Sequence, residues 1–277
     1  MPKVVWRFFM RKIHSHFVID YYSYRSGLGR WNPLLKIIFT LAALLAVIGT
    51  EDIQIAGITF LCMVVLVIKI GKVPLEEYGR LLMVPAVFIA TGAIVVLLQF
   101  EEGGTLLWKW KNLILEVYIT KENLKQASIL VAKSFSAVSV LYMLSLSTPI
   151  GEILQELKKW HMPSIVLDLM YLIYHYIFIL LEINHKQKEA AKARLGYRDW
   201  RIAIRTFAKE LSNLLILSLQ KSNTYFDAME ARGYCGELNF LVEKKPVTIS
   251  QLLVVGLYLA VTVFLILKKW AWFLFIK

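Results

Sequence analysis

The sequence predicts an all-α polytopic membrane protein with about five transmembrane helices and a cytoplasmic domain of long amphipathic helices. Of its 277 residues 58% are hydrophobic, and the mean hydropathy is +0.58, which is more apolar than a soluble domain of this length. The apolar residues form blocks, and basic residues, which give a net charge of +12, lie between those blocks. This distribution is typical of the cytoplasmic loops of a membrane protein and argues against a nucleic-acid partner.

Four apolar blocks follow the N-terminal segment 1–33, and each is near the ~20 residues that a spanning helix needs. Within region 34–148 we predict the spans Leu34–Thr50, Ile53–Ile70, Leu81–Gln99 and Ala127–Thr148. The segment Phe100–Gln126 contains Trp108 and Trp110, a residue type enriched at membrane surfaces. We therefore expect this segment to be an outer loop.

The positions of the basic residues predict the orientation in the cytoplasmic (inner) membrane. Positive charges precede the first span and follow the second: Lys3, Arg7, Arg11, Lys12, Arg25, Arg30, Lys69, Lys72 and Arg80. Cytoplasmic loops carry an excess of lysine and arginine. The N-terminus is therefore expected in the cytoplasm, and the fourth span is expected to return there.

The block Ile165–Ile183 is apolar enough for another span, but charge argues against a crossing. If it crossed, the strongly basic stretch Asn184–Pro246 would lie outside, against the positive-inside rule. The block also contains Asp168 and Glu182, which hydrocarbon tolerates poorly. We therefore predict that it lies at the cytoplasmic interface or packs against protein.

The block accordingly belongs to a predicted cytoplasmic or interfacial domain of helices at 149–247. One more apolar block, Thr248–Leu267, predicts the last span within region 248–277. The expected total is five crossings, with the C-terminus outside.

Two helices of the 149–247 domain are predicted to end alike. The first ends in Ala193-Arg194-Leu195-Gly196, and the second ends in Ala231-Arg232-Gly233. We expect Gly196 and Gly233 to supply the left-handed residue that stops each helix. Each arginine could simply cap its own helix, or its planar guanidinium could bind a groove on another protein.

The sequence contains no motif for catalysis or cofactor binding. It lacks a phosphate-binding P-loop, an HExxH motif and a GxSxG motif, each of which marks a particular chemistry. His14 and His16, near Asp20, could ligate a metal, although solvated histidines explain them more simply. Lys36 is expected to snorkel to the cytoplasmic face. We predict a protein that is not an enzyme and has no cofactor and no metal site.

The two Ala-Arg endings are part of a resemblance that covers nearly the whole chain. The other residues that carry it are Ile19 to Ser26, Asn32-Pro33, Lys36, Ser147-Thr148-Pro149, Glu152-Ile153-Leu154, Leu157, Met162-Pro163, Tyr174 and Tyr176. With these motifs the chain resembles the transmembrane T component of energy-coupling factor (ECF) transporters, most closely the cobalt-type CbiQ subgroup. The first ending departs from the Ala-Arg-Gly pattern at Leu195.

The resemblance implies a coupling subunit without catalytic activity, which joins two ABC-type ATPase subunits to a membrane substrate-binding subunit. It implies ATPase contacts at Ala193, Arg194, Leu195, Gly196, Ala231, Arg232 and Gly233. It implies an interface with the substrate-binding subunit at Pro149, Leu157, Pro163, Asp168, Tyr174 and Tyr176. Cobalt or nickel is the expected substrate. The alternatives are a T component of vitamin importers, a self-contained permease and a membrane enzyme.

Overall fold

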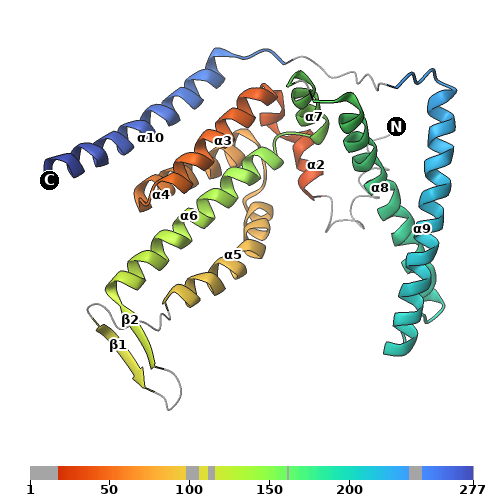
Figure 1. The fold of residues 1–277 in the computed structure, drawn as a ribbon, viewed down its shortest axis with the longest axis horizontal. Coiled ribbons are helices and arrows are strands. Elements are labelled where there is room, and N and C mark those ends of the chain that lie inside the picture. Colours follow the sequence, from red (N-terminus) through yellow and green to blue (C-terminus); the bar gives the residue numbers. More distant parts are fainter. Residues whose placement is uncertain (1–17, 98–105, 112–115, 161, 237–244, 277) are drawn as a thin grey trace. The chain divides into compact units, whose positions relative to one another are not determined.

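The computed structural model describes residues 18–97, 106–111, 116–160, 162–236 and 245–276 (Figure 1). The chain divides into two compact units. The first, which we call the membrane unit, contains Met1–Ile153 and Lys244–Lys277, and the second, the hairpin unit, contains Leu154–Glu243. Each unit is described by itself.

The membrane unit begins with the short helices α2 (Val18–Arg25) and η1 (Gly27–Arg30), followed by α3 (Pro33–Gly49). Asn32 caps α3, because its side chain accepts hydrogen bonds from the backbone N–H groups of Leu34 and Leu35, which have no partner inside the helix. Pro33 occupies the first helical position, where its missing N–H costs nothing.

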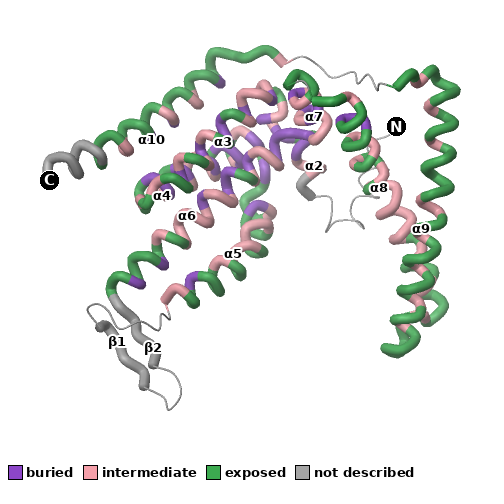
Figure 2. The backbone as a smooth tube through the Cα atoms, in the orientation of Figure 1, coloured by how far each residue is buried: buried purple, intermediate pink, exposed green. Residues whose placement is uncertain are grey.

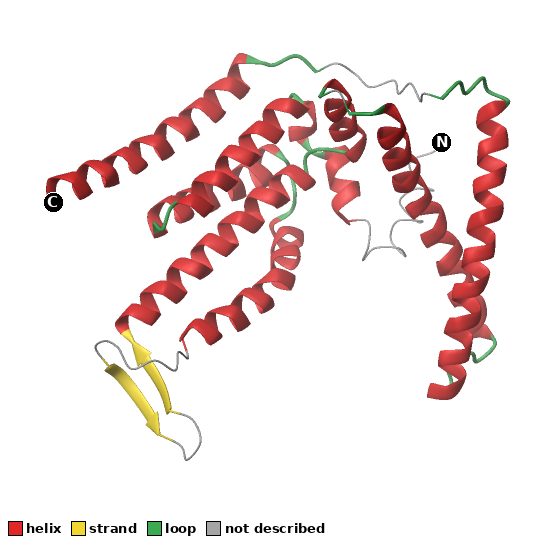
Figure 3. Ribbon diagram, in the orientation of Figure 1, coloured by secondary structure: helices red, strands yellow, loops and turns green. Residues whose placement is uncertain are grey.

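The next two helices are α4 (Ile53–Val65), which continues into the π-helical turn η2 (Leu66–Ile70), and α5 (Leu75–Leu97). A hairpin of β1 (Leu106–Lys111) and antiparallel β2 (Glu116–Thr120) leads to α6 (Lys121–Ser145) (Figure 3). The predicted outer loop thus contains two strands, and α6 begins at Lys121 rather than at Ala127. The alternation of Trp108 and Trp110 with lysines is the period-two signal for a strand.

The helices long and apolar enough to cross a membrane number five among the described residues. They are Ile53–Ile70, Leu75–Leu97, Lys121–Ser145, Ser164–Ala193 and Ile249–Lys269. The number agrees with the prediction, but one of the five helices is not one of the predicted spans. Ser164–Ala193 qualifies by length and composition, whereas α3 has 17 residues and falls in the shorter class. An interfacial position for the block 165–183 remains a prediction that rests on its charges.

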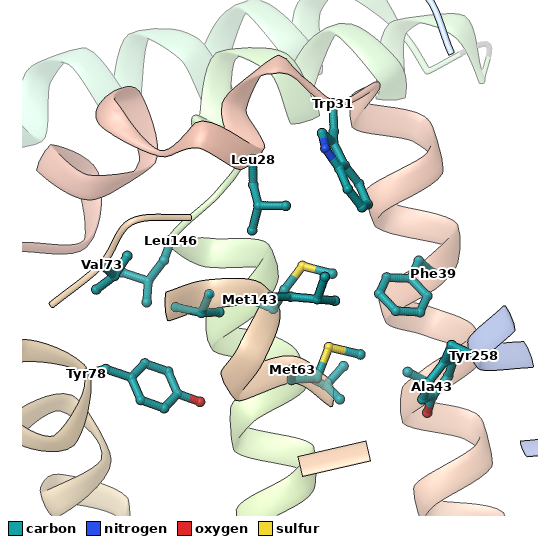
Figure 4. Packing of buried hydrophobic residues seen from close by; sticks show 13 residues of the cluster. Leu28, Trp31, Phe39, Ala43, Met63, Val73, Tyr78, Met143, Leu146 and Tyr258 are labelled. Atoms are coloured by element: carbon teal, nitrogen blue, oxygen red, sulfur yellow. The ribbon is translucent and has the colours of Figure 1, made fainter. Parts of the chain in front are cut away.

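The core of the membrane unit lies between η1, α3, α4 with η2, α5, α6 and α10 (Ile249–Ile276) (Figures 2 and 4). The Phe39 and Tyr258 rings meet edge to face at 5.2 Å. The Tyr258 hydroxyl lies 2.9 Å from Thr59 Oγ1, which satisfies two polar groups in an apolar region. Ser136 of α6 donates to the Ala56 carbonyl of α4 at 2.6 Å, so a small residue allows these two helices to approach closely.

The hairpin unit contains most of α7 (Ile150–Lys159), all of α8 (Ser164–Ala193) and all of α9 (Trp200–Glu230). The two long helices are joined by the turn 194–199 and contact each other (Figure 1). None of the residues of α9 is buried, and Figure 2 shows this helix as exposed and intermediate along its length. Such a helix has apolar surface available for a partner.

Candidate functional site

The end of α8 is a Schellman motif, a helix stop in which two backbone N–H groups bond back to earlier carbonyls. Gly196 N–H donates to the Ala191 carbonyl at 2.9 Å, and Leu195 N–H donates to the Lys192 carbonyl at 3.0 Å. This pattern makes Arg194 the C-cap residue and Leu195 the residue after it. Leu195 has a φ of 57°, so it adopts the left-handed conformation.

The prediction that Gly196 is the left-handed residue of this helix end is therefore wrong. The left-handed position falls on Leu195, and Gly196 lies one residue further along. A Cβ at Gly196 would come within 3.0 Å of both the Ala191 carbonyl oxygen and Thr206 Cγ2. Glycine is favoured at 196, because any side chain there would press against the end of α8 and against Thr206 of α9.

The end of α9 repeats the same motif. Tyr234 N–H donates to the Met229 carbonyl at 3.0 Å, and Gly233 N–H donates to the Glu230 carbonyl at 2.9 Å. Arg232 is again the C-cap residue, and Gly233 has a φ of 83°, as predicted. The two Ala-Arg endings are therefore structurally equivalent caps, with Leu195 in the position that Gly233 occupies.

The two capping arginines lie at opposite ends of one antiparallel helix pair. Close to the turn, Gly196 lies beside Thr206. At the far end, the Tyr234 hydroxyl donates to Asp168 Oδ2 at 3.4 Å, and Asp168 lies in the first turns of α8. Because α8 has 30 residues, a rise of ~1.5 Å per residue separates the ends by about 45 Å.

Aromatic contacts also join α8 to α9 between these ends. The Tyr225 ring meets the His175 ring at 5.8 Å and the Tyr176 ring at 5.3 Å. Such pairs stabilise the packing by ~0.5–1.5 kcal/mol each. The hairpin is thus held near both ends and at positions between them, which makes it a stiff element.

Both arginine side chains are available to a partner. Arg194 and Arg232 are exposed, and in the part of the chain that the structure describes no carboxylate forms an ion pair with either guanidinium. An unpaired guanidinium at a helix end offers a planar fork of donors for carbonyl or carboxylate oxygens.

Two tyrosines next to the caps have raised pKa values. The Tyr197 hydroxyl donates to Glu210 Oε2 at 2.7 Å, and this hydrogen bond is the main reason that the Tyr197 pKa lies above its ordinary value. Desolvation and then the Asp168 carboxylate raise the pKa of Tyr234. Both hydroxyls therefore stay protonated at neutral pH and act as donors that fasten the helix ends.

The residues predicted to contact a substrate-binding subunit are divided between the two units. Pro149 is buried in the membrane unit, whereas the others belong to the hairpin unit. Asp168 is buried and bonds Tyr234, and Tyr174 meets Phe178 edge to face at 4.9 Å. Leu157 and Tyr176 are half-buried, and Pro163 is exposed.

Exposed apolar residues also recur along each of the two long helices, at a spacing of three or four residues. On α8 they are Ile165, Leu169, Ile173 and Ile177. On α9 they are Ile204, Phe207, Leu211, Leu215 and Leu219. Exposed apolar stripes of this length are typical of protein or membrane contacts.

The prediction that Lys36 snorkels to the cytoplasmic face is wrong, because its side chain is fully buried. Its Nζ donates to the Ser147 carbonyl at 2.7 Å and to the Leu28 carbonyl at 3.4 Å. The carbonyl of Ser147 is free to accept because α6 ends at Ser145, which leaves unpaired acceptors there. Lys36 thus joins η1, α3 and the end of α6.

A polar contact that sequence reasoning missed lies close by, in the membrane unit. Lys245 Nζ bonds Glu152 Oε1 and the Gly29 carbonyl. Asn32 Nδ2 donates to the Lys245 carbonyl at 2.8 Å. Because 93 residues separate Glu152 from Lys245 in the chain, no local pattern could have paired them.

Among the described residues, no group of three or more histidine, cysteine, aspartate or glutamate side chains could hold a metal ion. His14 and His16 lie outside the described residues.

Lys133, in the middle of α6, donates to the Ile48 carbonyl at 3.0 Å. Like Lys36, it bonds the backbone of its own chain.

The fold and the site together define a multi-pass membrane protein that carries a helical hairpin capped by an exposed arginine at both ends. Residues 25–242 match the CbiQ family, described as cobalt transport protein, so the chain belongs to this transport family. The predicted resemblance to CbiQ is confirmed.

Named relatives agree with this assignment. The chain is 31% identical over 263 residues to a putative fused cobalt transport protein CbiMQ of Methanocorpusculum labreanum; the match covers 92% of this chain and 43% of that protein. It is 26% identical over 189 residues to the cobalt transport protein CbiQ of Rhodobacter capsulatus, over 68% and 71% of the two chains. It is 21% identical to CbiQ of Salmonella typhimurium over 222 residues, 80% and 98% of the two chains.

Proposed function

We propose that this chain is the transmembrane coupling subunit (T component) of an ECF importer. In this role it transmits ATP-driven motion of two cytoplasmic ABC-type ATPases to a membrane substrate-binding subunit. Membership in a cobalt transport family favours cobalt, or the chemically similar nickel, as the transported ion. The chain is a non-catalytic subunit, and its partners hydrolyse ATP and select the ion.

The observation that carries this proposal is the pair of equivalent arginine caps at opposite ends of one stiff hairpin. A separation of about 45 Å allows two different protein subunits to be contacted at once, one at Arg194 and one at Arg232. Exposed guanidiniums suit acceptor oxygens in a groove of each ATPase. The apolar stripes of α8 and α9 suit burial against the substrate-binding subunit.

The coupling step follows from this arrangement. ATP binding draws the two ATPases together and displaces the α8 end relative to the α9 end. Stiff helices carry the displacement, and their apolar faces tilt the substrate-binding subunit so that the ion is released to the cytoplasm. Because Lys36 and Lys133 bond backbone carbonyls of this chain, neither is available to line a permeation path, which favours a coupling role over a self-contained permease.

The experiment compares Arg194→Ala, Arg232→Ala and the double variant with the wild-type chain. Each arginine removal leaves acceptors of the partner unpaired, which costs ~2–5 kcal/mol at a buried contact. We expect reduced recovery of ATPases with the tagged chain for each single variant, and loss of recovery and of cobalt uptake for the double variant.

Arg205→Ala is the matched control, because Arg205 is an exposed arginine of α9 at neither cap. It is expected to behave as the wild type. Normal ATPase recovery and cobalt uptake by the double variant would contradict the coupling role.

A further inference from the structure

The two helix caps differ in the residue that takes the left-handed position. Leu195 and Gly233 both follow a capping arginine and both have positive φ, 57° and 83°. Glycine adopts this conformation freely, whereas leucine is strained in it, because its Cβ approaches the backbone. The α8 cap therefore retains a residue that its own backbone disfavours.

Packing within the described chain does not account for that leucine. The Leu195 side chain is 66% exposed. Apolar contacts in a Schellman motif normally involve the residue one position later, which here is Gly196 and has no side chain. A strained residue with no internal compensation indicates a function outside the fold.

The surroundings of Leu195 resemble the centre of a protein interface. Trp200, in the first turn of α9, is 79% exposed, and Arg194 is exposed beside Leu195. Tryptophan and arginine are enriched among residues that dominate binding energy. At the other cap, Gly233 has no side chain at the left-handed position, and the nearest exposed large apolar residue before Arg232 is Phe226, at 49%.

We infer that Leu195 is an apolar anchor that determines how the α8 cap binds its ATPase. This inference rests on the proposed function. The leucine side chain inserts into an apolar site next to the oxygens bound by Arg194, with Trp200 covering the contact. The hairpin consequently holds one ATPase by arginine plus an apolar side chain at the left-handed position, whereas the cap that holds the other has glycine there.

This asymmetry has a consequence for salt dependence. Contacts between charges at an accessible interface weaken as ionic strength rises, whereas burial of apolar surface does not. The α8 cap is therefore the salt-resistant attachment, and the α9 cap is the attachment that loosens first.

The test uses the full chain in nanodiscs and the ATPases recovered with the wild-type chain. Leu195→Gly and Leu195→Asn both accept the left-handed conformation and remove the apolar side chain. We expect both to weaken ATPase affinity by about tenfold or more, the equivalent of withdrawing a buried leucine. Leu195→Met restores an apolar group and is expected to recover most of that loss.

The melting temperature of the chain without ATPases shows whether Leu195 anchors a partner or only stabilises the fold. Leu195→Gly relieves strain, so this temperature is expected to hold or rise while affinity falls. A purely structural leucine predicts that both quantities fall together.

In high salt, Arg232→Ala is expected to retain its ATPase better than Arg194→Ala.

Unchanged affinity in Leu195→Gly, with reduced affinity in Arg194→Ala, would overturn the anchor and leave the coupling role intact. Unchanged affinity in both would argue against the coupling role itself.

Trp200 also permits a test of a lipid contact. If brominated lipids quench the fluorescence that Trp200→Phe removes, the tip lies on the bilayer and the anchor is overturned.

Discussion

Glu152 and Lys245 form an ion pair that joins the two points where the chain leaves and re-enters the membrane unit. Glu152 lies just before the hairpin unit, which begins at Leu154, and Lys245 lies just after it. Their side chains are 11% and 20% exposed. The pair therefore holds both connections together on the membrane unit.

The first prediction concerns this pair. Lys245→Met removes the ion-pair partner of the largely buried Glu152 carboxylate, and breaking a buried pair costs ~3–5 kcal/mol. We expect a marked fall in the melting temperature measured by scanning fluorimetry in detergent. The double variant Glu152→Gln/Lys245→Met removes both charges and is expected to recover part of the loss. If the losses of Glu152→Gln alone and of Lys245→Met alone simply add up to the loss of the double variant, the two side chains are not coupled.

The second prediction concerns Lys36. Lys36→Met preserves the length of the side chain but leaves the Ser147 carbonyl without the Lys36 donor, at a cost of ~1–3 kcal/mol, while the Leu28 carbonyl keeps the Trp31 N–H as a donor. We expect a lower melting temperature and a looser junction of α3 with the end of α6. Lys133→Met is the control, because the Lys133 contact is exposed and should matter less. Equal effects of the two substitutions would count against a structural role specific to Lys36.

The third prediction separates the two cap glycines. Gly196→Ala places a Cβ against the Ala191 carbonyl and Thr206, whereas Gly233→Ala meets no atom within 4 Å but is strained by its φ of 83°. Each is expected to destabilise the chain by ~1 kcal/mol. Adding Thr206→Ala should relieve part of the Gly196→Ala defect and none of the Gly233→Ala defect. Thermal unfolding of the four variants decides between these causes.

The fourth prediction concerns topology. In a chain with Cys62 and Cys235 replaced by serine, cysteines at Ser212 and Lys121 report the two sides of the membrane. We expect a membrane-impermeant maleimide to label position 212 only from the cytoplasmic side and position 121 only from outside. Labelling of position 212 from outside would show that α8 crosses the membrane.

Local sequence patterns were sufficient for most of the helices and for the equivalence of the two arginine endings. The span Ile53–Ile70 was predicted with the same bounds that the apolar helix has, because length and hydropathy alone determine such a segment. The Asn32-Pro33 start of α3 likewise follows from capping chemistry. The β-hairpin was missed, since its alternating tryptophans were interpreted only as surface anchors.

Contacts between distant segments could not be predicted in this way. Lys36 reads as a snorkelling lysine until the carbonyls that surround it are known, and those carbonyls belong to Leu28 and Ser147. From the sequence, Gly196 was expected to be the left-handed residue, and only the backbone angles and hydrogen bonds of the folded chain assign that position to Leu195.

The sequence by itself determined that this is a polytopic membrane protein with two arginine-capped helices, because hydropathy, charge and capping act over a few neighbouring residues. Only the tertiary structure decided that the two arginines lie at opposite ends of one hairpin, that Leu195 is strained, and that Lys245 meets Glu152. These features depend on which distant segments pack together, and packing is a property of the whole fold.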